Sequence, residues 1–209
     1  MLYKSGHCMS DPANIALAAI LHDLGKLYQR AHWGREPEGV SDWSHPAYTA
    51  WAIGRHRGLF ERAGLEPDWL AQTAARHHEG WRDKPQYQPQ TPEGWCVALA
   101  DTYASRERLE VDKKGSRAPD TPLKSVFANL RVQETYGQRD HGYSMVEAGR
   151  EVGLKLGGAY PQARPNVSRD TYWRLAERLD GRLTELAKHS LGPEALLMNL
   201  LGIFQELLW

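Results

Sequence analysis

Cysteine is scarce in this sequence, and long apolar runs are missing from it. The two cysteines, Cys8 and Cys96, are far apart and form no CxxC pattern, so they predict neither a zinc motif nor a required disulfide. A reducing, cytoplasmic setting is therefore expected. No run of 18 apolar residues predicts a membrane-spanning helix. The first residues, MLYKSGHCMSDP, lack the apolar core of a signal peptide, and we expect no membrane partner.

An excess of charge of either sign is also missing. The chain has 26 Lys and Arg residues and 26 Asp and Glu residues, which argues against a protein coated in positive charge that binds duplex DNA indiscriminately. A local basic groove is still compatible with this balance. Arginine outnumbers lysine 18 to 8, which suits bidentate recognition of phosphate. Codon bias or a warm-living source explains the excess of arginine equally well.

Helix signals recur along the chain, and no long alternation of apolar and polar residues predicts a strand. Asp11-Pro12, Ser44 and Glu66-Pro67 are typical helix starts. The first helix is predicted to run through NIALAAILHDLGKLYQR, and TPLKSVFANL is predicted to be a short helix or a strand. Further helices are predicted at residues 45–60, 68–81, 93–109, 143–156, 168–189 and 193–208. These patterns predict an all-α fold.

The last residues, FQELLW, lie inside an apolar run. One interpretation is a terminal helix that docks on the core. The other is that the natural chain continues beyond Trp209, so that the sequence is a piece of a longer protein.

Six imidazole and carboxyl side chains are candidate metal ligands. A His-Asp dipeptide alone is a weak signal, but here it is followed by further histidines and a carboxylate, each group on a separate predicted helix. Helices of a bundle can direct such groups into one interior site. The candidates are His22, Asp23, His45, His77, His78 and Asp101.

Two of these carboxylates lie in apolar segments, Asp23 in LAAILHDLG and Asp101 in CVALADTYA. An ionised carboxylate in such surroundings is costly unless a cation compensates it, and a divalent metal does so. Ordinary ion pairs are the alternative. Asp23 has Lys26 three residues later, and Asp101 is followed by Arg106 and Arg108.

The types of ligand narrow the choice of metal. Imidazole and carboxylate without thiolate suit Mn, Fe, Co, Ni or Zn. Six candidate ligands are compatible with one octahedral ion or with two ions that share Asp23. Two ions about 4 Å apart hold the attacking and leaving oxygens in a phosphoryl displacement.

Other side chains are candidates for supporting roles. Lys26 is a catalytic candidate because its charge would neutralise a phosphate, although it equally suits a structural pair with Asp23. Four tryptophans lie near the proposed ligands and are candidates for stacking on unpaired bases, with core packing as the alternative; they are Trp33, Trp43, Trp81 and Trp95. The candidate contacts to a nucleic-acid backbone are Arg30, Arg76, Arg106 and Arg108, with solvated helix faces as the alternative.

Five segments in order, HDLGKLYQRA, SHPAY, RHHEG, ALADTYASRER and TPLKSVFANL, resemble the N-terminal HD domain of the large, polymerase-like subunit of type III CRISPR effector complexes. The resemblance is closer to the Csm-type subunit than to the Cmr-type and covers about residues 13–130. It implies an HD-domain helical bundle at residues 1–130. Residues 131–209 would form a helical extension that leads towards a polymerase-like part.

The resemblance also implies a function. The family's HD domain is a divalent-metal nuclease acting on single-stranded DNA, helped by Mn or Ni, and its partners are effector subunits and guide RNA. His22 and Asp23 match the family's ligand pair, His77, His78 and Asp101 match its later ligands, and His45 matches as well. The chain contains no GGDD motif, so the cyclic oligoadenylate synthesis of the whole subunit is not expected of it.

One departure from ordinary HD phosphohydrolases bears on this assignment. Those proteins carry an additional histidine on a helix well upstream of the HD pair, whereas only His7 precedes the pair here. The effector-subunit domain is a rearranged version of the fold, so the absence fits it. His141 is a candidate for the missing ligand, with a surface histidine as the alternative.

Two other functions remain open at this point. One is a phosphohydrolase of small nucleotides, which would normally need the upstream histidine. The other is a non-catalytic domain that docks partner subunits, although a site without function has no physical need for buried carboxylates.

Overall fold

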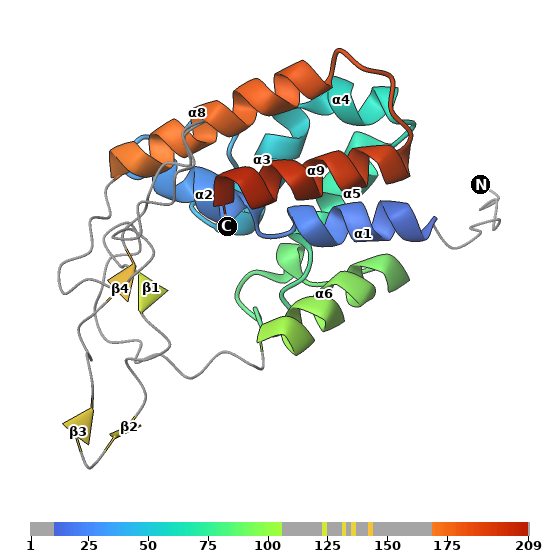
Figure 1. The fold of residues 1–209 in the computed structure, drawn as a ribbon. Coiled ribbons are helices and arrows are strands. Elements are labelled where there is room, and N and C mark those ends of the chain that lie inside the picture. The colour runs from blue at the N-terminus through green and yellow to red at the C-terminus, as the bar shows by residue number, and fades with distance from the viewer. Residues whose placement is uncertain are drawn as a thin grey trace.

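The computed structural model describes residues 11–105 and 169–208, together with four two-residue strands between these ranges. The first range forms α1 (Pro12–Leu21), α2 (Leu24–Ala31), α3 (His45–Arg55), α4 (Arg57–Arg62), α5 (Pro67–Ala75), the 3-10 helix η1 (Pro85–Tyr87) and α6 (Pro92–Ser105). The second forms α8 (Arg169–Leu186) and α9 (Pro193–Leu208). The prediction of an all-α fold is confirmed (Figure 1).

The four strands are short and pair locally. β1 (Leu123–Lys124) is antiparallel to β4 (Gly142–Tyr143), and β2 (Arg131–Val132) is antiparallel to β3 (Thr135–Tyr136). β1 lies within the segment predicted as a short helix or a strand. The helix predicted at residues 143–156 lies outside the described residues, apart from the tyrosine that ends β4.

The predicted helix starts are confirmed. Asp11 caps α1, because its carboxylate accepts a hydrogen bond from the Ala13 N–H at 2.9 Å, and Pro12 occupies the first helical position. α3 begins directly after Ser44, and α5 begins at Pro67 after Glu66. These residues favour a helix start because proline needs no partner for a backbone N–H there.

The prediction of one continuous helix through residues 14–30 is wrong. The chain leaves helical geometry at Asp23, where φ is −100° and ψ is 3°, and α2 then begins. The cause is a contact with α3. The Thr49 hydroxyl accepts a hydrogen bond from the Gly25 N–H at 3.0 Å and donates one to the His22 carbonyl at 2.9 Å. These bonds stabilise a corner at His22-Asp23.

The close approach of α3 to this corner also requires glycine at position 25. A Cβ atom there would lie 1.9 Å from the His45 carbonyl oxygen, far inside van der Waals contact. Two further predicted helices also differ from the structure. The helix predicted at 45–60 divides at His56 into α3 and α4, and the helix predicted at 68–81 ends early, at Ala75.

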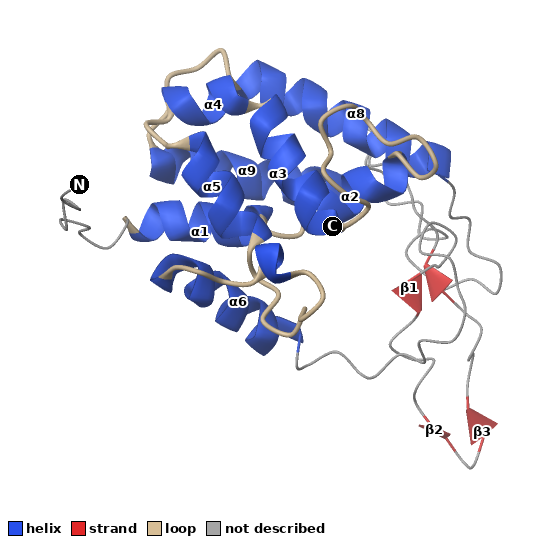
Figure 2. Ribbon diagram, turned by 180° about the vertical axis from the view of Figure 1, so that it is seen from behind, coloured by secondary structure: helices blue, strands red, loops and turns tan. Residues whose placement is uncertain are grey.

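The helices at the two ends of the sequence share one hydrophobic core. α8 packs along α2, and α9 packs along α1, with α6 on the opposite side of α1 (Figures 1 and 2). Leu17, Leu70, Leu179 and Leu200 are all fully buried in this core. Each such side chain contributes about 1.5–3 kcal/mol on burial. The described C-terminal helices thus pack as part of the same body, and the boundary predicted at residues 130/131 lies outside the described residues.

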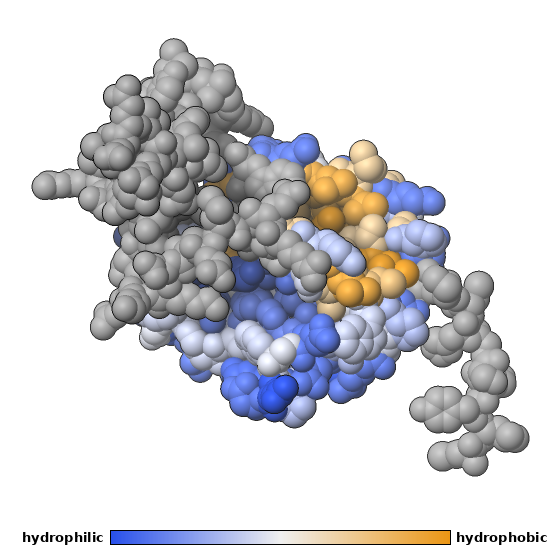
Figure 3. Space-filling model, turned by 90° about the horizontal axis from the view of Figure 1, so that it is seen from below, coloured by the Kyte–Doolittle hydropathy of each residue, from blue (hydrophilic) through white to orange (hydrophobic). Residues whose placement is uncertain are grey.

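The surface shows where the apolar residues are incompletely covered. The view from the side on which α6 lies shows a hydrophobic patch in a largely hydrophilic surface (Figure 3). On α6 itself, Trp95 and Leu99 are exposed. In the described part of the chain, no helix combines the length and the apolar character that crossing a membrane requires.

Candidate metal centre

The corner between α1 and α2 is the centre of a cluster of polar side chains. It presents His22 and Asp23, and three further segments bring their side chains to it: the start of α3, the residues just after α5, and the middle of α6. The structure therefore brings together all six side chains that the sequence singled out, namely His22, Asp23, His45, His77, His78 and Asp101.

Asp23 connects most of these groups. Its Oδ2 lies 3.4 Å from Nε2 of His22, and its Oδ1 lies 3.5 Å from Nε2 of His45 and 4.0 Å from Nε2 of His77. Nε2 of His22 also lies 3.5 Å from Oδ1 of Asp101. The two carboxylate oxygens of Asp23 thus face different histidines.

The backbone orients two of the imidazoles. Nδ1 of His22 is 2.5 Å from the Ala19 carbonyl oxygen, and Nδ1 of His77 is 2.8 Å from that of Ala74. Because a carbonyl only accepts, each ring carries its proton on Nδ1. In the neutral form of each ring, Nε2 is then unprotonated and directed towards the cluster, as in histidines that bind metals.

Several buried atoms at the centre of the cluster have no hydrogen-bond partner in the described part of the chain. They are Nε2 of His22, Oδ1 of Asp23 and Nε2 of His77. A buried polar atom without a partner costs about 1–3 kcal/mol. Three such atoms facing one another, all of them electron-pair donors, match the needs of a divalent cation.

The spacing of the donor atoms supports the same conclusion. For a metal–nitrogen bond of about 2.1 Å, neighbouring ligand atoms lie roughly 3.0 Å apart in octahedral and 3.4 Å apart in tetrahedral coordination. The distances at Asp23 start at 3.4 Å, and the Nε2 atoms of His45 and His78 are 2.8 Å apart. These residues therefore fit a divalent ion.

The donor atoms form two overlapping groups. One comprises His22, Asp23 and His77, and the other comprises His45, His77 and His78; within each group the donor atoms lie within 4.8 Å of one another. His77 belongs to both. With Asp23 facing both groups through different oxygens, the arrangement has the form expected if two ions share ligands.

The pKa values favour the ligand forms of three histidines. Burial, together with the positive charge of Lys26, lowers the pKa of His45 to about 3. Burial, with the neighbouring His77, lowers the pKa of His78 to about 4. The pKa of His77 is lowered as well, by burial and then by His22. All three rings are neutral near pH 7, so their lone pairs are available to a metal.

His22 and Asp23 differ from these three because they form a charge-stabilised pair. Burial lowers the pKa of His22, but the nearby carboxylate of Asp23 outweighs this effect and the pKa is raised. Burial also raises the pKa of Asp23, but His22 and then Lys26 outweigh it, so the pKa lies far below its usual value. Asp23 is therefore ionised at all physiological pH values.

Lys26 forms the ion pair that the sequence left as an alternative. Its Nζ, in the first turn of α2, lies 2.5 Å from Oδ2 of Asp23. Its side chain is 41% exposed, so the ammonium group is accessible at the edge of the cluster. This ion pair uses only one carboxylate oxygen of Asp23, because Oδ1 still has no hydrogen-bond partner.

The predicted arginine contacts lie apart from the cluster or outside the described residues. Arg30 donates to the Tyr172 hydroxyl at 3.2 Å, and its guanidinium lies over that ring, so it joins α2 to α8. Arg76 donates to Oε1 of Gln90. Arg106 and Arg108 lie outside the described residues, as do His7 and His141.

The four tryptophans singled out in the sequence have different surroundings. Trp33 and Trp43 pack edge to face, with ring centroids 5.1 Å apart. Trp95 is 41% exposed on α6. Trp81 stacks on His78, with ring centroids 4.0 Å apart and an interplanar angle of 3°. The contact of Trp81 with a candidate ligand was not anticipated.

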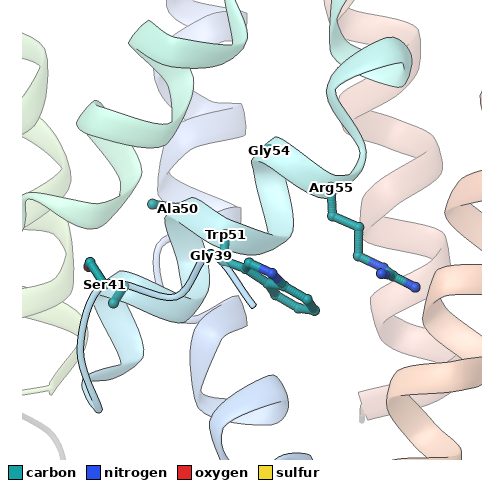
Figure 4. A pocket seen from close by; sticks show the side chains of 7 residues that line it. Gly39, Ser41, Ala50, Trp51, Gly54 and Arg55 are labelled. Atoms are coloured by element: carbon teal, nitrogen blue, oxygen red, sulfur yellow. The ribbon is translucent and has the colours of Figure 1, made fainter. Parts of the chain in front are cut away.

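A separate hollow of about 590 Å³ lies between α3 and the loop that precedes it (Figure 4). Small residues of α3 form part of its wall, and the side chains of Trp51 and Arg55 lie side by side at one end. None of the six candidate ligands lines it, so it is distinct from the metal centre.

Sequence reasoning missed the residues that shape the corner. Thr49 and Gly25 hold α3 against the break between α1 and α2. Glycine after an HD pair is visible in the sequence, but its contact with α3 is tertiary and has no local signal.

The comparisons with known proteins agree with this geometry. Residues 6–106 match the HD domain family. No curated protein and no solved structure matches the chain. The chain thus carries an HD domain, an all-α fold of metal-dependent phosphohydrolases, with a His and Asp cluster able to hold a metal. Nothing in these matches indicates a type III effector subunit, so that narrower assignment stays a prediction.

Proposed function

We propose that this chain is a divalent-metal-dependent nuclease that cleaves phosphodiester bonds of single-stranded DNA. The proposal that the chain is a hydrolase rests on one observation: metal-donor atoms of His22, Asp23 and His77 converge and have no hydrogen-bond partners among the described residues. The choice of single-stranded DNA is supported by the resemblance of the five sequence segments to the type III effector subunit, which also makes effector subunits and guide RNA the proposed partners.

The types of donor atom also indicate which metals the centre would bind. Four imidazoles and two carboxylates without thiolate favour Mn or Ni, with Co, Fe or Zn as further candidates. When bound, the ion supplies Lewis-acid polarisation of phosphate oxygens and a source of hydroxide near neutral pH. The overlapping ligand groups accommodate one or two such ions.

The residues of the chain have distinct roles in this scheme. Asp23, ionised and facing both histidine groups, balances the positive charge of the centre. His22 and His77 are held with Nε2 inwards by backbone carbonyls. Lys26, accessible at the edge, is placed to neutralise a phosphate oxygen as charge develops on it.

A substrate panel tests the proposal. The purified chain would be incubated with single-stranded DNA, single-stranded RNA, duplex DNA, and nucleoside mono- and triphosphates, each with Mn²⁺, Ni²⁺, Mg²⁺ or a chelator. We expect cleavage of single-stranded DNA with Mn²⁺ or Ni²⁺ ahead of Mg²⁺, and none with the chelator. Hydrolysis of the small nucleotides with intact DNA would instead establish a nucleotide phosphohydrolase. Inactivity on every substrate, without bound metal, would favour a docking domain.

A further inference from the structure

The four histidines of the metal centre are held in two different ways. His22 and His77 each donate from Nδ1 to the carbonyl three residues earlier, at 2.5 and 2.8 Å. Such a bond fixes the orientation of a metal-binding ring, and its loss typically lowers metal affinity about 10- to 100-fold.

His45 and His78 have no such bond. In the described ranges, no hydrogen bond reaches Nδ1 of either ring, and the two rings meet through their Nε2 atoms at 2.8 Å. One indole contacts both of them instead. Trp81 lies face to face on His78, with centroids 4.0 Å apart and an interplanar angle of 3°, and meets His45 edge to face at 5.8 Å and 81°.

The backbone that carries the indole is held by its own segment. The Trp81 carbonyl accepts hydrogen bonds from Nε2 of Gln88 at 3.1 Å and from the Lys84 N–H at 3.2 Å. The Lys84 ammonium lies 5.7 Å from the centre of the indole ring. One face of the indole is thus already occupied by His78, and a cation lies near the ring.

This segment is anchored to the loop that leads into α3. Tyr87 accepts a backbone hydrogen bond from the His78 N–H at 3.1 Å, and its hydroxyl donates to Oδ2 of Asp42 at 2.8 Å. Asp42 lies three residues before His45, so the same contacts hold the segment that carries Trp81 against the start of α3.

We propose that Trp81 is the positioning residue of the His45–His78 half of the metal centre. Its ring performs for these two histidines the orienting role that the Ala19 and Ala74 carbonyls perform for the other two. The inference rests on the metal centre of the proposed function, and it assigns Trp81 an effect on one of the two ligand groups only.

Metal titration of the full chain by calorimetry tests this role, with Mn²⁺ and Ni²⁺ as the probes. Trp81→Leu keeps much of the volume but removes the aromatic ring, and we expect it to weaken metal binding about 10- to 100-fold. Trp81→Phe keeps a stacked ring and should bind within a few-fold of the parent chain. Trp173→Ala is the matched control, because Trp173 contacts His32 rather than a candidate ligand.

Nuclear magnetic resonance of the metal-free chain gives a second measurement. The Trp81 ring current should shift the ring protons of His78 upfield, and the shift should be lost in Trp81→Leu but kept in Trp81→Phe. Metal affinity in folded Trp81→Leu equal to that of the parent would overturn the positioning role while leaving the metal centre intact. Absence of metal binding in the parent chain would instead overturn the proposed function.

Discussion

Two half-buried aspartates, Asp23 and Asp180, show how differently the molecule treats the same side chain. Their side chains are 27% and 23% exposed. Asp180 accepts hydrogen bonds from the Tyr28 hydroxyl at 2.6 Å, from His56 Nε2 at 2.9 Å and from Arg55 Nε at 3.2 Å. Asp23 has one close cationic partner and an Oδ1 without a hydrogen-bond partner.

The difference separates a structural carboxylate from a candidate functional one. At Asp180 the donors come from α2 and from the junction of α3 and α4, so the carboxylate fastens α8 to the rest of the bundle. At Asp23 the facing groups include three imidazoles, and two of these, His45 and His77, are neutral near pH 7 and offer lone pairs rather than protons. Polar atoms that lack hydrogen-bond partners, rather than burial, distinguish the metal centre.

The largest expected effect is on catalysis at the metal centre around Asp23. We expect His22→Ala and Asp23→Ala each to reduce cleavage of single-stranded DNA by at least about 100-fold while the chain still unfolds cooperatively. Initial cleavage rates and circular dichroism melts would measure this. Saturating Mn²⁺ should raise the melting temperature of the parent chain but not that of Asp23→Ala. Undiminished cleavage by both variants would remove the basis for the proposed site.

The next largest effect is on the stability of the fold, through the hydrogen bonds of Asp180. Asp180→Ala leaves the Tyr28 hydroxyl and the His56 ring without their acceptor, and we expect it to lower the free energy of unfolding by roughly 2–4 kcal/mol. Urea denaturation would measure the loss. Cleavage activity per folded molecule should stay unchanged, because Asp180 contacts none of the candidate ligands. A selective loss of activity would show that the two aspartates are coupled.

The smallest effect is on how the stability of the fold depends on pH. Burial raises the pKa of Asp180, but hydrogen bonds from His56 and Tyr28 outweigh it, so the pKa is lowered in the folded state. A carboxyl of this kind stabilises the fold above its unfolded pKa of about 3.9, and the contribution is lost as the pH falls through the folded value. Asp180→Asn should therefore flatten the loss of stability below about pH 4. Parallel curves for variant and parent, in urea melts from pH 7 to pH 2.5, would contradict this.

Much of the fold followed from local signals in the sequence. Asp11-Pro12, Ser44 and Glu66-Pro67 marked helix starts correctly because the preference of proline for the first turn, and the cap at Asp11, depend on neighbouring residues alone. The six candidate ligands were chosen from their types and apolar surroundings, and the structure brings them together, with Asp101 beside His22. Their roles in catalysis remain predictions.

What the sequence did not reveal depends on contacts between distant residues. The break at His22-Asp23 requires the Thr49 hydroxyl, and an uninterrupted helical pattern conceals it. Tyr28 and Asp180 are 152 residues apart, so no local pattern joins them. Trp81 was noted as a possible platform for bases, but its contact with His78 depends on the path of the chain after α5.

The candidate ligands come from four stretches of chain between His22 and Asp101. An ion held by them would close loops across this whole region, much as a disulfide does, although a chelator could reverse it. Resistance of the bundle to proteases would then rise and fall with the concentration of free metal. The same side chains that support hydrolysis would thus let the cell's metal supply set the lifetime of the protein.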